Sequence, residues 1–285
     1  MNFRAYIKLM RPKHYLKNVL IFLPLVFSGY LFTEEYFLRS VYSFFAFSMV
    51  ASAVYVLNDM NDKYLDARHP KKKNRPIAAG IISKQSAILF VALLLIVACL
   101  FQYLAGFTLE SVGLLLLYMG INIAYSLGLK NIPIVDVTIL ALGFVLRVLY
   151  GGSSVGIDVS KWLYLAVLAF SFYLGLGKRR NEIRFNGTKT RKVNRFYNQD
   201  FLDKNMYVCL GLAIVYYSLW AIDPLQKHKL MYLTIPVVIM IVMTYSLTVE
   251  GSDSDGDPIN VLFSNKLLLG MSAFYALLVV GLVYI

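Results

Sequence analysis

Charged residues are scarce in this sequence: they make up 15% of its 285 residues, while apolar residues make up 59%. Soluble domains carry about a quarter charged residues and about half apolar ones. The shortage of charge therefore excludes an ordinary soluble domain. Because an α-helix needs an apolar run of about 20 residues to cross a bilayer, the composition predicts an all-α, polytopic integral membrane protein.

Cysteine and histidine are also scarce, with two and three residues respectively. Cys99 and Cys209 lie inside apolar runs without a second cysteine at ligand spacing, so we expect small buried side chains and no disulfide framework. The histidines His14, His69 and His228 show no metal-ligand spacing either. The sequence therefore offers no zinc site and no plausible catalytic histidine or cysteine.

Apolar runs divide the chain into nine predicted spans, and no soluble domain lies between them. We therefore expect one integral membrane domain over residues 1–285. The first span is short, and Pro24 within it favours a kink. The predicted spans are residues 19–33, 40–58, 85–105, 110–128, 132–149, 162–177, 206–222, 230–248 and 266–285.

The net charge of +12 is unevenly distributed along the chain. With nine spans, all but five of the 28 lysines and arginines fall on the side of the membrane that holds the N-terminus. Because basic loops stay in the cytoplasm, we expect a cytoplasmic N-terminus in the cell membrane. The active site is then expected on the cytoplasmic side, in loops 59–84, 129–136 and 178–205. Basic residues in short loops between spans favour contact with anionic lipid and not with nucleic acid.

Oxygen-bearing side chains cluster where the second span meets a basic loop. Asn58, Asp59, Asp62 and Asp66 fall within about 100° of arc if one helix continues through them. Carboxylates that close repel one another unless a cation neutralises them, and hard oxygen ligands suit Mg²⁺ shared with the phosphates of a substrate. A solvated helix end, with acids that merely lie near lysines, is the alternative interpretation.

Polar side chains inside the spans are informative, because a bilayer penalises unsatisfied polar groups. In the fifth span, Asp136 and Arg147 point the same way and lie about 16 Å apart along the helix. Arg147 either has a partner on another helix or binds a ligand, and the sequence leaves both open. Near the end of the fourth span, Asn122, Tyr125 and Ser126 share one face.

Three consecutive cations, residues 178–180, follow the sixth span, and Glu182 comes one turn after the first of them. Gly175 and Gly177 precede the cations and predict a loosened helix end. Alone, such a run is usually a cytoplasmic anchor; opposite a cluster of aspartates it becomes half of a site for anions and metal. The acidic loop 250–258 lacks the bidentate glutamate of a calcium site, so we interpret it as a solvated loop.

Four polar segments occur in one order over residues 11–182. They are Arg11-Pro12-Lys13-His14-Tyr15-Leu16-Lys17-Asn18, then Asn58 to Asp66 with Asn74-Arg75-Pro76-Ile77-Ala78-Ala79-Gly80, then Ala124-Tyr125-Ser126 with Leu129-Lys130 and Asp136 to Gly152, and finally Gly177-Lys178-Arg179-Arg180-Asn181-Glu182. Together they resemble the motifs of the UbiA superfamily of intramembrane prenyltransferases, and most closely its decaprenyl-phosphate phosphoribosyltransferase branch. The last hundred residues are similar to the family mainly in hydropathy.

The resemblance implies a UbiA-type helical bundle, with Mg²⁺ as cofactor, that acts at the cytoplasmic face. In the branch named, phosphoribosyl diphosphate gives its 5-phosphoribosyl group to a polyprenyl phosphate and releases diphosphate, a step toward a sugar donor for the cell envelope. The implied Mg²⁺ ligands are Asn58, Asp59, Asp62 and Asp66, and the implied catalytic residues are Asp59, Asp62 and Lys178. The implied substrate-binding residues are Lys17, Asn18, Arg75, Tyr125, Lys130, Asp136, Arg179, Arg180 and Glu182.

The chain departs from most of the superfamily at one place. Members that transfer a prenyl group to an aromatic acceptor usually carry a second aspartate-rich motif after the sixth span. This chain has three cations and one acid there, over residues 178–182. A donor with a diphosphate and a 5-phosphate, together with a lipid phosphate, has too much negative charge for one Mg²⁺, so the added cations favour phosphoribosyl transfer.

Two other functions stay open at this point. The first is UbiA-type transfer of a polyprenyl group from its diphosphate to an aromatic acceptor. The second, from another class, is a secondary transporter that uses Asp136 and Arg147 as a pair at the membrane midplane. The gathering of charged groups at one end of the spans argues against alternating access. The sequence fixes neither the length of the lipid nor the oligomeric state.

Overall fold

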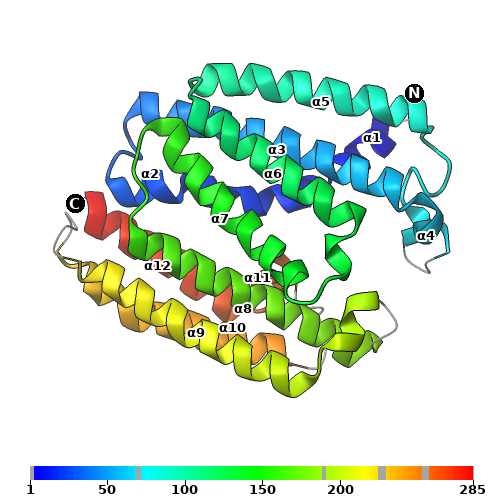
Figure 1. Ribbon diagram of the computed structural model, residues 1–285. Helices are drawn as coiled ribbons and strands as arrows, with labels where there is room; N and C mark the ends of the chain where they lie inside the picture. The colour runs from blue at the N-terminus through cyan, green and yellow to red at the C-terminus, as the bar shows by residue number, and fades with distance from the viewer. Residues whose placement is uncertain (1–2, 69–71, 188–190, 224–228, 252–256, 285) are drawn as a thin grey trace. The chain divides into compact units, whose positions relative to one another are not determined.

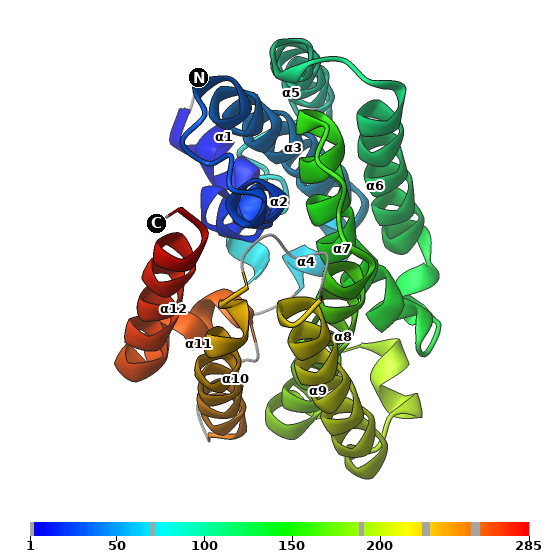
Figure 2. The same cartoon turned by 90° about the vertical axis from the view of Figure 1, so that its left-hand side faces the viewer.

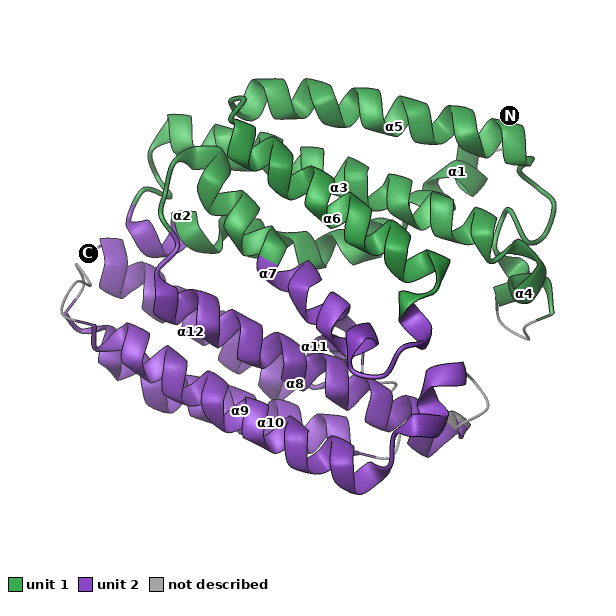
Figure 3. Cartoon of the chain, viewed as in Figure 1, with its two compact units in different colours: residues 1–25, 30–129, 146–158 green, residues 26–29, 130–145, 159–285 purple. Residues whose placement is uncertain are grey.

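The computed structural model describes residues 3–68, 72–187, 191–223, 229–251 and 257–284. Within these ranges the chain is helical and contains no strand, which confirms the all-α prediction (Figure 1). The chain divides into two compact units (Figure 3). Unit 1 comprises residues 1–25, 30–129 and 146–158, and unit 2 comprises residues 26–29, 130–145 and 159–285.

Unit 1 is built around one long helix, α3 (Glu34–Asn61). Four elements pack against it: α1 (Phe3–Met10), the 3₁₀ helix η1 (Pro12–Phe22), α5 (Lys84–Ala105) and α6 (Leu109–Leu127). The short elements α4 (Lys63–Ala67) and η2 (Lys72–Asn74) contact each other after the end of α3. Three elements, α2 (Leu23–Ser28), η3 (Leu129–Asn131) and α7 (Val135–Val155), belong partly to each unit.

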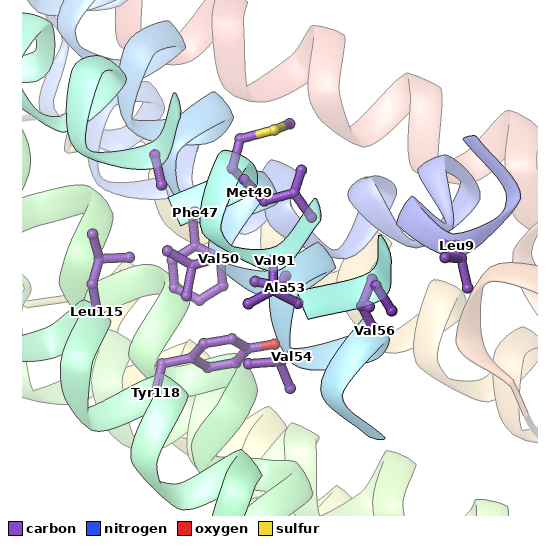
Figure 4. Packing of buried hydrophobic residues seen from close by; sticks show 14 of the residues in the cluster. Leu9, Phe47, Met49, Val50, Ala53, Val54, Val56, Val91, Leu115 and Tyr118 are labelled. Atoms are coloured by element: carbon purple, nitrogen blue, oxygen red, sulfur yellow. The ribbon is translucent and has the colours of Figure 1, made fainter. Parts of the chain in front are cut away.

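Small residues on α3 allow its neighbours to approach closely. Ala46, Ala51 and Ala53 are each at most 2% exposed. Close packing of this kind drives helix association inside a bilayer, where lipid tails are as apolar as the side chains. Larger side chains fill the space beside these alanines. Figure 4 shows this core, with Phe47, Val50 and Val54 of α3, Val91 of α5, and Leu115 and Tyr118 of α6.

Unit 2 contains the remaining long helices. These are α8 (Lys161–Asn186), α9 (Gln199–Ala221), α10 (Ile235–Glu250) and α12 (Lys266–Tyr284), with the short elements η5 (Lys192–Phe196), η6 (Met231–Thr234) and α11 (Pro258–Ser264). The helices α8 and α9 pack along each other, and α10 lies between α9 and α12 (Figure 2). Tyr173, Leu202 and Met206 are fully buried in the core that these helices share.

Six helices in the described part of the chain are long and apolar enough to cross a membrane: α3, α5, α6, α7, α10 with η6, and α12. The protein is therefore a multi-pass membrane protein. The other three predicted spans lie on η1 with α2, on α8 and on α9, so the count of nine stays a prediction. The prediction of a single membrane domain is likewise untested.

Burial within unit 1 separates a central helix from two outer ones. In α3, 67% of the 18-residue apolar stretch is buried, whereas the corresponding stretches of α5 and α6 are 28% and 17% buried. Apolar side chains that point away from the unit are stable in hydrocarbon, so α5 and α6 present faces suited to lipid. This corrects the expectation that Cys99 is buried: it is exposed on α5, because apolar sequence predicts contact with either protein or lipid.

Some predictions concern residues outside the described ranges, including His69, His228, Asp253 and Asp255. The last two belong to the acidic loop, whose Asp257 is described. Asp257 caps α11, since its Oδ1 accepts a hydrogen bond from the backbone N–H of Ile259 at 3.1 Å. That aspartate is thus part of a helix N-terminus.

Candidate active site

Two buried carboxylates of unit 1 converge on one arginine where α3 ends. Arg75 Nη1 lies 3.0 Å from Asp59 Oδ1 and 2.6 Å from Asp66 Oδ2. Both aspartates are 3% exposed. The two carboxylate oxygens are therefore no farther apart than the sum of those distances. The structure thus brings together three residues that the sequence analysis selected.

A second arginine completes this cluster and was missed by the sequence analysis. Arg11 Nη2 lies 2.5 Å from Asp59 Oδ1, and its guanidinium lies over the ring of Tyr55 at 4.9 Å. Arg11 adopts the left-handed conformation, with φ of 55°. Its place at the start of the first polar segment was the one available signal. Asp59 thus has two arginine partners that offset the cost of burying its charge.

The helix breaks within the acidic segment, contrary to the continuous helix assumed above. α3 ends at Asn61 and α4 begins at Lys63, with Asp62 between them. The backbone N–H of Asp62 still donates to Asn58 O, and that of Asp66 donates to Asp62 O, both at 2.9 Å. These bonds keep Asp59 and Asp66 on one side despite the break. Asp62 is half-buried.

Asn58 faces α6 instead of the arginines. Its Oδ1 accepts a hydrogen bond from Ser126 Oγ at 2.7 Å, while Asn61 Nδ2 donates to Ser126 O at 3.1 Å. The ends of α3 and α6 are therefore pinned together through Ser126. Tyr125, a predicted substrate-binding residue on the same end of α6, is half-buried.

The donor chemistry of this cluster fits a hard divalent cation. Among the residues that the structure describes, no group of three or more histidine, cysteine or acidic side chains is placed to hold a metal. Mg²⁺ does not require such a group, because it commonly takes one or two carboxylates and completes its shell with substrate phosphates and water. Asp59 and Asp66 already direct oxygens toward a shared cation, the guanidinium of Arg75.

Arg147 has partners on other elements of unit 1, which supports the first of its two interpretations. Its Nε donates to Asn18 Oδ1 at 2.8 Å and its Nη2 donates to Tyr118 OH at 3.2 Å. The guanidinium also lies 5.0 Å from the ring centre of Phe47. Asn18 is 1% exposed and donates to Ser48 Oγ at 2.9 Å. Arg147 thus ties α7 to η1 and α6, and Asn18 ties η1 to α3.

Replacing Arg147 by methionine is expected to lower the free energy of unfolding by about 1 to 3 kcal/mol, because a buried acceptor on Asn18 loses its donor. The midpoint temperature of the detergent-solubilised protein, followed by size exclusion after heating, measures the effect. Arg68→Met on the exposed end of α4 is the matched control and should leave the midpoint unchanged. A variant with wild-type stability that has lost substrate binding would instead support the ligand interpretation.

Unit 2 contains a second buried charge network. Arg179 Nε donates to Asp136 Oδ2 at 2.6 Å, and Arg179 Nη1 donates to Glu182 Oε2 at 2.6 Å. Asp136 and Arg179 are both completely buried. The hydroxyl of Tyr197 donates to Asp136 Oδ1 at 2.6 Å. Asp136 and Arg147, the two residues that a transporter was expected to use, each contact partners within their own unit.

Glu182 is held in its charged form. Burial opposes ionisation, yet neighbouring cations lower the pKa of this carboxyl below its ordinary value. These cations are Arg179, Arg191 and Lys178. Arg180 forms an ion pair with Asp203 of α9. Two of the three consecutive cations after the sixth span are therefore bound to carboxylates within unit 2.

The glycines before these cations serve close packing, which corrects the expectation of a loosened helix end. The helix α8 continues without interruption to Asn186. A Cβ on Gly175 would lie 2.9 Å from Val137 Cγ1, and one on Gly177 would lie 3.3 Å from Met206 Sδ. Both distances are too short for a relaxed contact, so glycine lets α7 and α9 approach α8.

The remaining predicted residues are half-buried. They are Lys17 on η1, Lys130 on η3 and Lys178 on α8. These three side chains are more exposed than the fully buried guanidinium of Arg179. The roles assigned to all these residues stay predictions.

Comparison with known proteins identifies relatives along the whole chain. The model of the UbiA prenyltransferase family matches residues 22–267. Decaprenyl-phosphate phosphoribosyltransferase from Corynebacterium glutamicum is 29% identical, over 98% of this chain and 86% of its own. The protein of the same name from Mycolicibacterium smegmatis is 30% identical, over 92% of this chain and 87% of its own. The resemblance inferred from the four polar segments is thereby confirmed.

A solved structure shares the fold. The UbiA homolog from Archaeoglobus fulgidus bound to GPP and Mg²⁺ superposes with a TM-score of 0.74 and 18% identity, over 98% of this chain and 99% of that one. This likeness confirms the predicted UbiA-type fold. It extends over the last hundred residues, which the sequence matched mainly by hydropathy.

Proposed function

The chain belongs to the UbiA prenyltransferase family, and on that premise we propose that it transfers 5-phosphoribosyl from phosphoribosyl diphosphate to a polyprenyl phosphate. The observation that carries the proposal is similarity over more than nine-tenths of the chain to proteins named decaprenyl-phosphate phosphoribosyltransferase. A donor with a diphosphate and a 5-phosphate needs more positive charge than a prenyl diphosphate does. Within the run at residues 178–180, Arg179 and Arg180 already pair with carboxylates, so Lys178 is the cation that agrees with the proposal.

Asp59, Asp62 and Asp66, with Asn58, are the proposed ligands of Mg²⁺. When bound, Mg²⁺ would neutralise charge that develops on the departing diphosphate. Asp59 and Asp66 contribute carboxylates that already share one cation. Arg75 is half-buried beside them, so its guanidinium can turn from the aspartates to a phosphate of the donor. Arg11 keeps Asp59 oriented through its ion pair.

Lysines are the proposed direct phosphate ligands, and Arg179 is proposed to support them. Lys17, Lys130 and Lys178 are half-buried and carry flexible ammonium groups. Arg179 instead has its guanidinium on Asp136 and Glu182, which favours a role in fixing the end of α8 that carries Lys178. Tyr125 of unit 1 and Arg180 of unit 2 are each proposed as substrate-binding residues.

The reaction depends on how the two substrates are placed and on positive charge around the diphosphate. It does not depend on a residue that transfers a proton. The bond from the ribose C1 to the diphosphate oxygen breaks, and a bond from C1 to an oxygen of the lipid phosphate forms. A lipid phosphate is already an anion at neutral pH, so no general base is required. Attack from the face opposite the diphosphate inverts C1. Positive charge around the diphosphate stabilises the leaving group as C1 gains oxocarbenium character.

The membrane setting fits a lipid acceptor. Helices such as α5 and α6 present apolar faces at which a polyprenyl tail can lie. The proposed orientation places the N-terminus and loops 59–84 and 178–205 in the cytoplasm, where phosphorylated donors are found, in the cell membrane. The product would serve as a precursor of a sugar donor for the cell envelope.

Isolated membranes that contain the protein, incubated with radiolabelled phosphoribosyl diphosphate, polyprenyl phosphate and Mg²⁺, are expected to yield label that extracts into organic solvent. Chelation by EDTA should reduce the labelled lipid to background, and added Mg²⁺ should restore it. The reason is that the lysines and arginines alone do not neutralise enough of the negative charge on the departing diphosphate. Membranes without the protein are the control, and mass spectrometry identifies the lipid.

The rival reactions predict other results in the same assay. Transfer of label from a prenyl diphosphate to an aromatic acceptor, with none from phosphoribosyl diphosphate, would identify a prenyltransferase. Uptake of label into sealed vesicles without covalent attachment to lipid would favour the transporter. If labelled lipid still forms in the presence of EDTA, the reaction does not require Mg²⁺.

A further inference from the structure

Ile134 has a backbone conformation that its side chain disfavours. Its φ is 70°, in the left-handed region. Only two non-glycine residues of the described ranges have positive φ, Arg11 and Ile134. A β-branched side chain there is a genuine outlier, and such strain persists only where surrounding contacts hold it. Ile134 directly precedes α7, at the end of the segment 129–134 that begins with η3 and carries Lys130.

The contacts that hold Ile134 form a chain of three hydrogen bonds. The backbone N–H of Ile134 donates to Tyr197 OH at 2.6 Å, and that hydroxyl donates to Asp136 Oδ1 at 2.6 Å. The other carboxylate oxygen of Asp136 accepts from Arg179 Nε at 2.6 Å. Tyr197 is 6% exposed, and Asp136 and Arg179 are not exposed at all. The backbone of segment 129–134 is thus linked to α8 through one tyrosine hydroxyl.

Further contacts hold Tyr197 itself in place. It follows η5, its backbone N–H donates to Asn194 O, and its ring stacks on Phe201 with 6.0 Å between centroids. Burial and the neighbouring carboxylate of Asp136 raise the pKa of the Tyr197 hydroxyl, so the group stays protonated and continues to donate. This hydroxyl accepts from the backbone and donates to the carboxylate, so both contacts depend on one oxygen atom.

We propose that Tyr197 is a positioning residue for donor binding: it holds Ile134 in the left-handed conformation and so fixes segment 129–134, which presents Lys130 to a phosphate. This inference rests on the proposed function for the identity of the ligand. Tyr197 is remote in sequence from every polar segment that resembles the family, and its role follows from the contacts alone.

Tyr197→Phe removes only the hydroxyl and is expected to raise KM for phosphoribosyl diphosphate about tenfold, the effect of losing a hydrogen bond to a charged partner, while kcat stays within about twofold. Tyr207→Phe, on the exposed side of α9, is the matched control and should leave both constants unchanged. A wild-type KM in Tyr197→Phe would overturn the proposal, and so would a fall in kcat alone.

A second substitution separates positioning from general support of the fold. Glycine adopts positive φ without steric cost, so Ile134→Gly in the Tyr197→Phe background should bring KM back to within about threefold of the wild type. Ile134→Ala retains the Cβ that opposes this conformation, and should not restore KM. Equal effects of glycine and alanine would show that the strained backbone is not what Tyr197 controls.

Hydrogen exchange of the amides in segment 129–134 provides a readout that does not depend on the reaction. Tyr197→Phe is expected to speed exchange at Ile134 at least tenfold, because that amide loses its acceptor, and an unchanged rate would refute the proposal. Absence of lipid labelling by the wild type would refute the proposed function, and the role of Tyr197 in donor binding with it. The exchange result distinguishes that failure from a failure of the positioning contact.

Discussion

Asp59→Asn is expected to lower kcat/KM for phosphoribosyl transfer by about 10²- to 10³-fold, the usual cost of removing a group that stabilises charge in a transition state. Asparagine keeps the size of the side chain and one oxygen but removes the charge. Asp59 accepts from both Arg11 and Arg75, so the substitution would weaken the metal site and also misplace two cations. Initial rates of lipid labelling at several concentrations of donor and Mg²⁺ measure the loss.

The control for Asp59→Asn is Glu110→Gln, which neutralises an exposed carboxylate in the first turn of α6 and should leave the rate unchanged. Recovery of the variant from membranes in a monodisperse form shows that the loss of activity does not come from misfolding. Asp62→Asn is a second variant, since Asp62 is less buried than Asp59 and its loss disturbs the fold less. Near-wild-type turnover in both variants would reduce the cluster to a structural role.

Elements that depend on local sequence were predicted well. The apolar run at residues 85–105 became α5 (Lys84–Ala105) almost to the residue, because most of its side chains separately favour hydrocarbon. The first predicted span was less accurate. A 3₁₀ helix runs to Phe22, and α2 follows only as far as Ser28, before Gly29 with φ of 83°. Apolar content predicts contact with protein or lipid, but it does not distinguish one helix type from another.

Partners that lie far apart in the chain could not be predicted. The sequence left Arg147 with two interpretations, because its acceptor on Asn18 is 129 residues away. The same limit applies to Arg11, whose ion pair with Asp59 depends on a left-handed turn that the residue type does not favour. Tyr197 was missed for a similar reason, since its function depends on the conformation of Ile134.

The acidic segment shows which part of a site is local. Its residue types and spacing were enough to predict that Asp59 and Asp66 share a side, and Arg75 was assigned to the same site. The break at Asp62 and the contact of Asn58 with Ser126 depend on α6, so a helical wheel drawn on one segment could not include them. It was therefore easier to predict which side chains meet here than to predict the course of the backbone between them.

Arg179→Met is expected to have the largest effect on stability, a loss of about 3 to 5 kcal/mol in the free energy of unfolding, because it leaves the buried carboxylate of Asp136 without its cation. Arg179 and Asp136 are completely buried, and Glu182 shares the same guanidinium. The readout is the fraction of detergent-solubilised protein that stays monodisperse after heating. Arg184→Met, an exposed cation on the same helix, should change the midpoint little.

A double variant tests the electrostatic reason for that loss. Asp136→Asn removes one of the two carboxylates that Arg179 neutralises, yet it keeps an oxygen that can accept from Tyr197. Combined with Arg179→Met it should recover part of the stability, with a coupling of about 0.5 to 3 kcal/mol. Strictly additive losses would show that packing of the long side chain, and not its charge, is what unit 2 requires of Arg179.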